Sequence, residues 1–545
     1  MPQLPASRTE SEQWGTPVFS KHADLAGATV VLIGFVWRLW RAQATFFNTD
    51  EAWHYSLANQ SSLAAAYKAS LTLLHPPLLV FVLYFWRHLG TSNLWLRLPS
   101  VLAGTALCWA VYKWLSRVFG RSVGWAGLIL VTLLAPMVAL SAELRQYTLM
   151  MVFAVGSAYL LEAALAENSI GHMAGSCVCL YLAMLSHYSA FLFAAGLGIY
   201  AVARMLRERP PAALVAMWSA GQAAGIGLAY VLYVTHISRL GSLYAGAQPL
   251  NNYADWYLSD WYFHPGRDRL LPFLFRGTLG VFRFTFGQIA VGQIAAGLFL
   301  AAVVLLARER PGPRQLASRS TAILLIVPFV LSWAAVRAGL YPFGRTRQCV
   351  FLALFVIAGV SVALLRISRE RAAIAWLLAL GMVIVGHARG TLQGRDMLPL
   401  AEQRHEHMDQ AVQFLRTQVS PQDLIFTDKA TSYQLAHYLC DQKAVAFDYG
   451  TEDYESFQCN GLRVRSTGPS AGALTADTVR LESGQHAYGS DLRSVWVVQG
   501  GWASGLGEAL RSRDPAFSRI QVHSFGRYFE VFQLPHPTPT QSPER

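Results

Sequence analysis

Long apolar runs separated by short polar segments occupy the first 390 residues. Most of them approach the roughly 17–25 residues that a membrane-spanning helix needs. The pattern predicts an α-helical polytopic membrane protein of about eleven transmembrane helices. The runs lie at 25–44, 98–116, 122–140, 148–166, 173–187, 189–203, 212–235, 288–307, 320–338, 349–365 and 372–388.

A further apolar run, Pro77–Trp86, is too short to span. About ten residues before a charged one is the length of an interfacial or re-entrant segment. Leaving this run out puts the N-terminus and the arginine-rich short loops on one side, which the positive-inside rule makes cytoplasmic. The segments then expected outside are 45–97, 141–147, 236–287, 339–348 and everything after 389.

The remainder of the chain predicts a soluble α/β domain. The expected division is a cytoplasmic tail (1–24), a transmembrane catalytic domain (25–390), an extracytoplasmic α/β domain (391–535) and a Pro-rich disordered tail (536–545). Helical spacing is seen at His405–Val419, Thr431–Tyr438 and Gly505–Arg511. Strand composition is seen at Leu424–Thr427, Ala444–Phe447, Ser494–Val498, Ile520–Phe525 and Tyr528–Leu534.

Composition and charge agree with this division. The chain is 53% hydrophobic and 14% charged, whereas soluble domains carry about 25% charged residues. Its net charge is +12, yet residues 389–545 carry 15 Lys and Arg against 18 Asp and Glu. The basic excess therefore lies in the membrane half. It indicates cytoplasmic loops and phosphate-binding sites rather than nucleic-acid binding.

Two adjacent carboxylates, Asp50 and Glu51, follow the first span on its outer side. One could take a proton from a hydroxyl group while the other positions the substrate or binds a cation. The alternative is an ordinary polar loop. Glu143 and Arg145 occupy the next outer boundary, where they could equally be an ion pair that caps a helix end.

Several cationic side chains face the same side. Arg345 and Arg347 stand two apart in an external loop against the charge bias, and contact with a phosphate or phosphoryl lipid explains them best. His75 and Arg97 precede prolines that could simply start helices, and both face the headgroup region. Arg38 faces that region too, although snorkelling to the interface is the simpler explanation.

Four motifs and their order carry a family resemblance. They are Asp50-Glu51, His75-Pro76-Pro77-Leu78, Arg97-Leu98-Pro99-Ser100 and Ser141-x-Glu143-x-Arg145-x-Tyr147. Ser186-His187-Tyr188 also looks like a family feature, although a lone His at a turn is more often structural. Over residues 25–390 the sequence resembles GT-C glycosyltransferases of the protein O-mannosyltransferase, aminoarabinose transferase and RgtA/B/C/D-like group.

The resemblance implies transfer of a sugar from a polyprenyl-phosphate donor to a lipid, glycan or protein acceptor. Transfer would occur outside the cytoplasmic membrane, with inversion. It implies Asp50 as the catalytic carboxylate, Glu51 as its partner and Glu143 in the second acidic place, where some relatives have Asp. Arg97 and Arg145 would face the lipid phosphate. The residues expected to bind substrate or lipid phosphate are Arg38, His75, Arg97, Arg145, Tyr147, His187, Tyr188, Arg345 and Arg347.

Other functions stay open at this point. One is a polysaccharide ligase or polymerase with a lipid-diphosphate donor, and another is a lipid or glycan transporter or flippase. A transporter places ionisable groups near the bilayer midplane, whereas these motifs cluster at one face. Asp50, Glu51, Glu143 and His75 could ligate a divalent metal ion, but neutralisation of the phosphate by arginine would make that ion dispensable.

The cysteines offer a test of the external assignment. Cys440 and Cys459 are the pair in the soluble domain, and an oxidising compartment would favour a disulfide between them. The alternative is two free thiols. The other four cysteines lie in or beside spans and are expected to be reduced.

Overall fold

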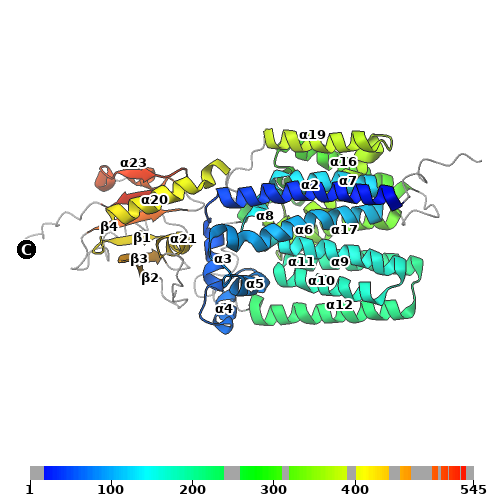
Figure 1. Cartoon of the computed structure of the whole chain (residues 1–545), viewed down its shortest axis with the longest axis horizontal. Helices are drawn as coiled ribbons and strands as arrows, with labels where there is room; N and C mark the ends of the chain where they lie inside the picture. Colours follow the sequence, from blue (N-terminus) through cyan, green and yellow to red (C-terminus); the bar gives the residue numbers. More distant parts are fainter. Residues whose placement is uncertain are drawn as a thin grey trace, which may run out of the picture.

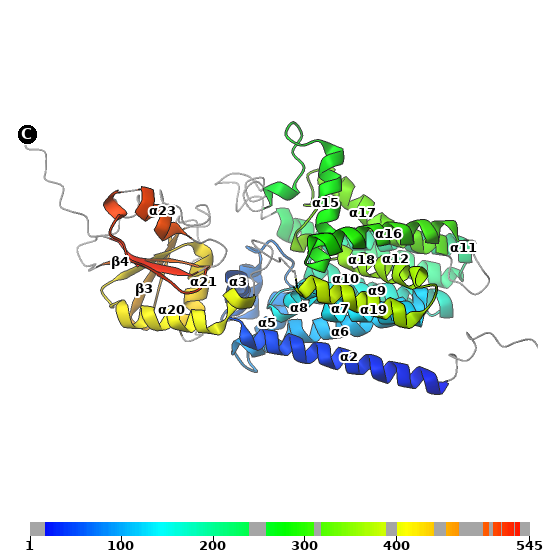
Figure 2. The ribbon, with the colours of Figure 1, turned by 90° about the horizontal axis from the view of Figure 1, so that it is seen from above.

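A bundle of long helices and a mixed α/β part lie end to end (Figures 1 and 2). This computed structural model describes residues 17–238, 258–309, 318–388, 400–440, 454–467, 494–500, 505–513, 515–527 and 529–534.

Among the residues that the structure describes, seven helices are long and apolar enough to cross a membrane. The pair α7 (Arg121–Leu133) and α8 (Ala135–Ala142), bent by 57° at its break, passes the same test when the two helices are taken together, and three shorter apolar helices accompany them. Together these helices coincide with the predicted apolar runs, so the polytopic helical architecture is confirmed. The seven are α2 (Pro17–Ala44), α6 (Asn93–Phe119), α9 (Tyr147–Glu167), α11 (Ser189–Glu208), α12 (Ala212–Leu232), α16 (Ile289–Arg308) and α17 (Ser318–Arg337); the shorter three are α10 (Ile170–Ser186), α18 (Leu352–Ile367) and α19 (Ala372–Ala388).

Three short helices form the first loop, at the end of the bundle that meets the α/β part (Figure 1). They are α3 (Thr49–Ala58), α4 (Leu63–Ser70) and α5 (Leu78–Trp86). The short apolar run is therefore the nine-residue α5, which does not span. The start of α2 and the α/β part lie at opposite ends of the bundle, as an odd number of crossings requires.

The longest helix that was not predicted is α15 (Leu270–Phe286); α3 and α4 were also assigned to a loop. The sequence places Arg276 and Arg283 inside α15, which broke the apolar run and left the segment assigned to a loop. It crosses the direction of the bundle helices (Figure 2). One side buries Phe273 and Phe284, whereas Leu271 is 78% exposed.

The centre of the bundle is α18, in which every residue from Leu352 to Leu365 is buried.

A buried ion pair lies near the end of the bundle that is farther from the α/β part. Arg204 of α11 contacts Glu162 of α9 at 2.8 Å, and both side chains are 1% exposed. The charge of Arg204 is therefore held inside the bundle.

In the described residues of the α/β part, six strands form a mixed sheet of order β2-β3-β1-β4-β6-β5, in which β1 is parallel to both β3 and β4. Its strands β2 and β3 were missed, although Asn460-Gly461 between them has positive φ at both residues (48° and 80°) and is a recognised hairpin signal. The predicted strand at 444–447 lies outside the described residues. The strands are β1 (Leu424–Thr427), β2 (Tyr454–Cys459), β3 (Leu462–Thr467), β4 (Val495–Gln499), β5 (Val522–Ser524) and β6 (Glu530–Gln533), and the helices are α20 (His405–Gln418), α21 (Lys429–Leu439) and α23 (Leu506–Arg513). Five short turns of other helix types are η1 (Tyr233–Ile237), η2 (Ser259–Trp261), η3 (Arg347–Cys349), η4 (Leu400–Gln403) and η5 (Pro515–Phe517).

Candidate active site

A capping box fixes the first turn of α3 and thereby the two adjacent carboxylates. The Asn48 side chain accepts from the backbone N–H of Glu51 at 3.0 Å, and Glu51 accepts from the N–H of Asn48 at the same distance. Both carboxylates lie at the helix N-terminus, where the helix dipole favours negative charge. Asp50 and Glu51 nevertheless point to different partners.

Asp50 meets two arginines from separate loops. Its Oδ2 lies 3.0 Å from Arg145 Nη1 and 3.3 Å from Arg347 Nη1. The Asp50 side chain is 22% exposed, whereas those of Arg145 and Arg347 are 6% and 3% exposed. Three sequence motifs far apart in the chain thus converge, and the carboxylate of Asp50 is the group that solvent reaches.

Glu143 completes this group from the end of α8. Its Oε2 lies 3.5 Å from Arg347 Nη1. Burial raises the pKa of Glu143, and the neighbouring Arg347 opposes that rise. The contact favours a role for Glu143 in orienting Arg347.

A turn packed against α15 carries Arg345 and Arg347. Gly280 of α15 lies against this turn, because a Cβ there would come within 2.8 Å of the Arg345 backbone nitrogen. Arg345 itself is half-buried. The unpredicted helix therefore supports the loop that delivers Arg347.

Glu51 and Arg97 form a buried ion pair. Arg97 Nε and Nη2 donate to the two Glu51 oxygens at 2.7 and 2.6 Å. The remaining donors of Arg97 bind the oxygen atoms of Ala42, Thr45 and Phe46. All N–H groups of Arg97 are therefore used within the protein. The geometry corrects two expectations: Arg97 does not face the lipid phosphate, and Glu51 is not a free partner of Asp50.

Arg38 also has a structural role, at the break between α7 and α8. Pro136 lacks the N–H that would bind the carbonyl of Thr132. Arg38 Nη1 donates to that carbonyl at 3.0 Å, and its Nη2 donates to the carbonyl of Val131 at 3.1 Å. The expectation that Arg38 faces lipid phosphate is therefore wrong; it satisfies carbonyls that the break exposes.

Aromatic rings gather beside Arg145. The rings of His75 and His187 stack with centroids 5.0 Å apart, and Tyr147 lies 5.1 Å from His187. Tyr188 turns away from this group, because its hydroxyl hydrogen-bonds to Nδ1 of His236. The structure thus brings three of the predicted ring residues together and leaves Tyr188 outside.

Two site residues were missed by the sequence analysis. His54 lies one helical turn after Asp50, and its Nδ1 is 2.7 Å from the Asp50 carbonyl oxygen. Its i+4 spacing from Asp50 was a signal that could have found it. Arg41, in the last turn of α2, is close enough to Glu143 for their charges to interact.

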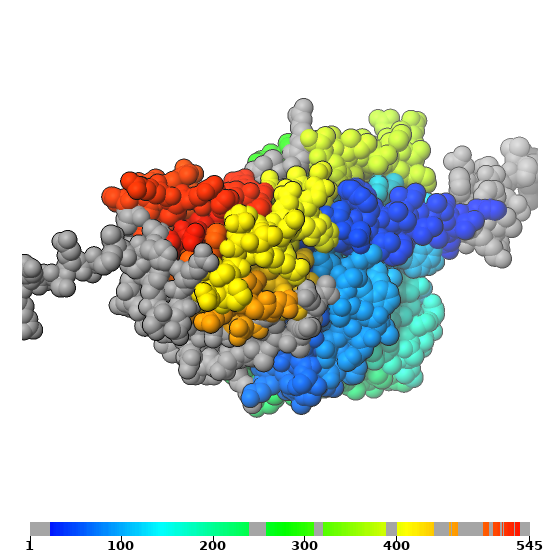
Figure 3. All heavy atoms as spheres, turned by 60° about the vertical axis from the view of Figure 1, so that its left-hand side comes forward, coloured from blue at the N-terminus to red at the C-terminus, as the bar shows by residue number. Residues whose placement is uncertain are grey.

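The α/β part contacts the segment that leads into α3. Its helix α21 provides Tyr438, whose hydroxyl accepts from the N–H of Phe47 at 2.7 Å, and Gln434, whose amide donates to the carbonyl of Phe47 at 2.8 Å. Asn93 of α6 also donates to Tyr438 at 2.9 Å. In Figure 3 the yellow segment that begins at residue 400 meets the blue N-terminal helices. The α/β part therefore fixes the entry to α3.

The sequence left metal binding open and predicted a disulfide between Cys440 and Cys459. Within the described ranges, no group of three or more His, Cys, Asp or Glu is arranged to hold a metal ion. Cys440 is disulfide-bonded. The side chain of Cys459 lies outside the described residues, so the pairing stays a prediction. The cysteines described as free thiols are Cys108, Cys177, Cys179 and Cys349.

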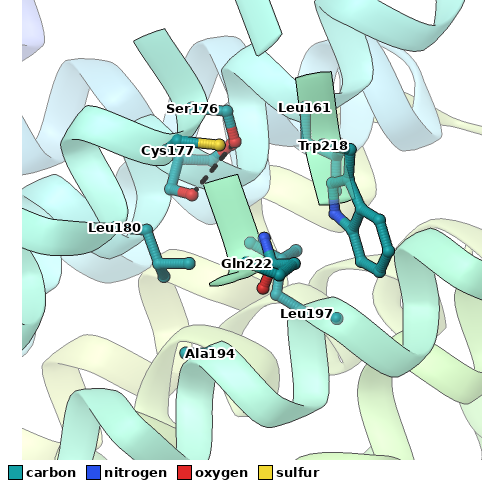
Figure 4. A pocket seen from close by; sticks show the side chains of 10 residues that line it. Leu161, Ser176, Cys177, Leu180, Ala194, Leu197, Trp218 and Gln222 are labelled. Atoms are coloured by element: carbon teal, nitrogen blue, oxygen red, sulfur yellow. Dashed lines mark hydrogen bonds between the residues drawn. The ribbon is translucent and has the colours of Figure 1, made fainter. Parts of the chain in front are cut away.

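A small hollow lies elsewhere, between α9, α10, α11 and α12 (Figure 4). Its free volume of about 10 Å³ suits a single water molecule. Ser176 beside it donates to the carbonyl of Ser157 at 2.8 Å. None of its lining residues belongs to the Asp50 site, and it is too small for a sugar.

Comparisons with known proteins agree with the overall fold. Residues 74–233 match the family described as dolichyl-phosphate-mannose-protein mannosyltransferase. The solved structure of ArnT from Cupriavidus metallidurans, bound to undecaprenyl phosphate, is similar at TM-score 0.51 and 14% identity, covering 93% of this chain and 97% of ArnT. This chain has the fold of the GT-C glycosyltransferases. The suspected GT-C resemblance is thereby confirmed at the level of the fold.

The archaeal oligosaccharyltransferase AglB from Archaeoglobus fulgidus, in complex with an inhibitory peptide and a dolichol-phosphate, overlaps at TM-score 0.45 and 12% identity. That overlap covers 76% of this chain and 63% of AglB. No curated protein sequence matches the chain.

Proposed function

We propose that this GT-C protein transfers a sugar from polyprenyl phosphate to an acceptor hydroxyl, with inversion at the anomeric carbon. The observation that carries the proposal is the partly exposed Asp50 carboxylate between Arg145 and Arg347. The acceptor oxygen attacks the anomeric carbon and its proton passes to Asp50. The bond from that carbon to the phosphate oxygen breaks, and polyprenyl phosphate leaves.

The leaving group determines what the site must supply. A phosphate monoester is already a good leaving group, so the enzyme has to hold its charge and deprotonate the acceptor. Guanidinium groups match phosphate oxygens in two-pronged geometry. We assign this role to Arg145, Arg345 and Arg347. Undecaprenyl phosphate in the ArnT structure is a molecule of the same class as the expected product.

Phosphate binding would also free the base. Asp50 shares Arg145 and Arg347 with the expected phosphate, and two guanidinium groups weaken a carboxylate as a proton acceptor. A bound phosphate competes for the same N–H groups. Donor binding would therefore release Asp50 to accept the proton of the hydroxyl.

The proposed orientation is a cytoplasmic N-terminus and an extracytoplasmic site in the cytoplasmic membrane. The arginine-rich loops at the opposite end of the bundle support it. Reporter fusions after Arg209 and Arg371 should read cytoplasmic, and a fusion after Gly394 should read external. An external reading after Arg371 would reverse the orientation.

Purified protein incubated with polyprenyl-phosphate and polyprenyl-diphosphate sugars tests the reaction. The readout is release of the free lipid carrier, with a lipid, glycan or peptide hydroxyl present as acceptor. We expect turnover with the monophosphate donors. Turnover with the diphosphate donors alone would indicate the ligase or polymerase reaction instead.

A further inference from the structure

A second polar group lies close to Arg145, whose charge acts on its three histidines. His54, His75 and His187 come from α3, from the loop before α5 and from the turn before α11. His75 stacks between the other two, with ring centroids 5.9 Å from His54 and 5.0 Å from His187. Tyr147 closes the group at 6.3 Å from His75.

Several polar atoms of this group are buried and unsatisfied. His54 and Gln146 are both 1% exposed. In the part of the chain that the structure describes, the Nδ1 of His75 has no hydrogen-bond partner. The Nε2 of His54 and both amide atoms of Gln146 make no hydrogen bond of good geometry, although these two side chains are close enough to interact. Buried polar atoms nearly always have partners, so these atoms indicate a polar ligand.

The hydrogen bonds that are present fix which ring nitrogen carries the proton. The Asp50 carbonyl can only accept, so Nδ1 of His54 is the donor and Nε2 is left as an acceptor. At His187 the donor and acceptor roles of the two ring nitrogens are reversed. Its Nδ1 accepts from the backbone N–H of Ser189 at 3.2 Å, which leaves Nε2–H as the donor. Together they present an acceptor and a donor.

The group is also uncharged at neutral pH. Burial, together with the nearby Arg145, lowers the pKa of both His54 and His187 to about 3. It lowers the pKa of His75 well below the usual range. Neutral imidazoles that donate and accept suit hydroxyl groups and give no charge to hold a phosphate.

We propose that His54, His75, His187 and Gln146 bind the hydroxyl groups of an uncharged sugar on the donor. His54 follows Asp50 by one helical turn, so a sugar bound here would have its reacting carbon near the carboxylate. The positive charge of Arg145 acts on all three imidazoles and disfavours an amino sugar. This inference rests on the proposed reaction and adds the class of sugar.

Donor kinetics of His54→Leu and His187→Leu test the site, in the full-length protein. We expect the KM for a polyprenyl-phosphate neutral hexose to rise by about 10-fold, the equivalent of one lost hydrogen bond. The affinity for sugar-free polyprenyl phosphate should stay unchanged. His88→Leu is the matched control, because His88 is an exposed histidine of the same loop. His54→Gln, which keeps an acceptor, should recover part of the loss.

Each outcome separates the two proposals. Equal losses for the hexose donor and the sugar-free lipid would overturn the sugar site, and so would an unchanged KM in both leucine variants. If the leucine variants do not fold, the wild-type protein decides: a preference for an amino-sugar donor over the neutral hexose contradicts the inference. Absence of turnover by the wild-type protein with every donor would instead contradict the proposed function.

Discussion

Arg97 donates hydrogen bonds to both carboxylate oxygens of Glu51, at 2.7 and 2.6 Å, and both side chains are buried. Glu51 also accepts from the backbone N–H of Leu144 at 2.7 Å. One ion pair thus joins α3, α6 and the loop that carries Arg145. The two adjacent carboxylates therefore have separate contacts: Glu51 pairs with Arg97, whereas Asp50 lies between Arg145 and Arg347.

Breaking this pair should destabilise the protein. Arg97→Ala leaves the Glu51 charge buried, which costs about 3–5 kcal/mol in the free energy of unfolding. Thermal denaturation in detergent measures the loss. Arg117→Ala is the control on the same helix, because its pair with Glu167 is 25% and 49% exposed and screened by water. Equal stability of the Arg97→Ala and Arg117→Ala proteins would refute the structural role of Arg97.

Arg347 should govern donor affinity. Arg347→Ala removes a charged hydrogen-bonding group, and we expect the donor KM to rise by about 10–100-fold. Arg347→Lys keeps the charge but loses the planar fork, so it should rescue only part of the affinity. Arg366→Ala, at the opposite end of the bundle, should leave the KM unchanged. Normal donor affinity in Arg347→Ala would remove this residue from the phosphate site.

The histidine group should make the fold sensitive to acid. The pKa of His54 and of His187 is about 3 in the folded protein, against about 6.5 when unfolded. Below pH 6.5 the unfolded chain therefore binds more protons, and stability falls as the pH falls towards 3. Melting temperatures measured from pH 7 to pH 5 should decrease, and His54→Gln should flatten the curve. An identical slope in wild type and His54→Gln would contradict the burial of a neutral imidazole.

The soluble domain should act on turnover through Tyr438. Tyr438→Phe removes the acceptor of the Phe47 N–H, just before the capping box of α3. We expect kcat to fall by about 10-fold with little change in donor KM, because Asp50 is displaced while the arginines stay in place. Tyr84→Phe, in α5 of the first loop, is the control. A change in KM alone would argue against a positioning role.

The lengths of the apolar runs made most of the fold predictable. The spans and the non-spanning Pro77–Trp86 follow from run length and charge placement, which are local properties of the sequence. The helix α15 was missed because Arg276 and Arg283 interrupt it. Its position depends on packing against the 343–345 turn, and no local pattern records that contact.

The sequence predicted most residues of the site, but not which of them contact one another. The loops that carry Asp50, Arg145 and Arg347 were placed on one side, and the structure brings these three residues together. Sequence could not tell that Arg38 binds the carbonyls exposed at Pro136, since that contact joins residues 94 positions apart. Nor could it separate Glu51 from Asp50, because their roles depend on which arginine each one meets.

The most direct test of the central claim compares Asp50→Asn with wild type. The substitution keeps the shape of the side chain and removes the base. With a polyprenyl-phosphate donor that the wild type uses, we predict at least a ~100-fold loss of kcat with normal protein level and melting temperature. Asp260→Asn, an exposed carboxylate in another outer segment, should behave as wild type. Wild-type turnover by Asp50→Asn would contradict the account.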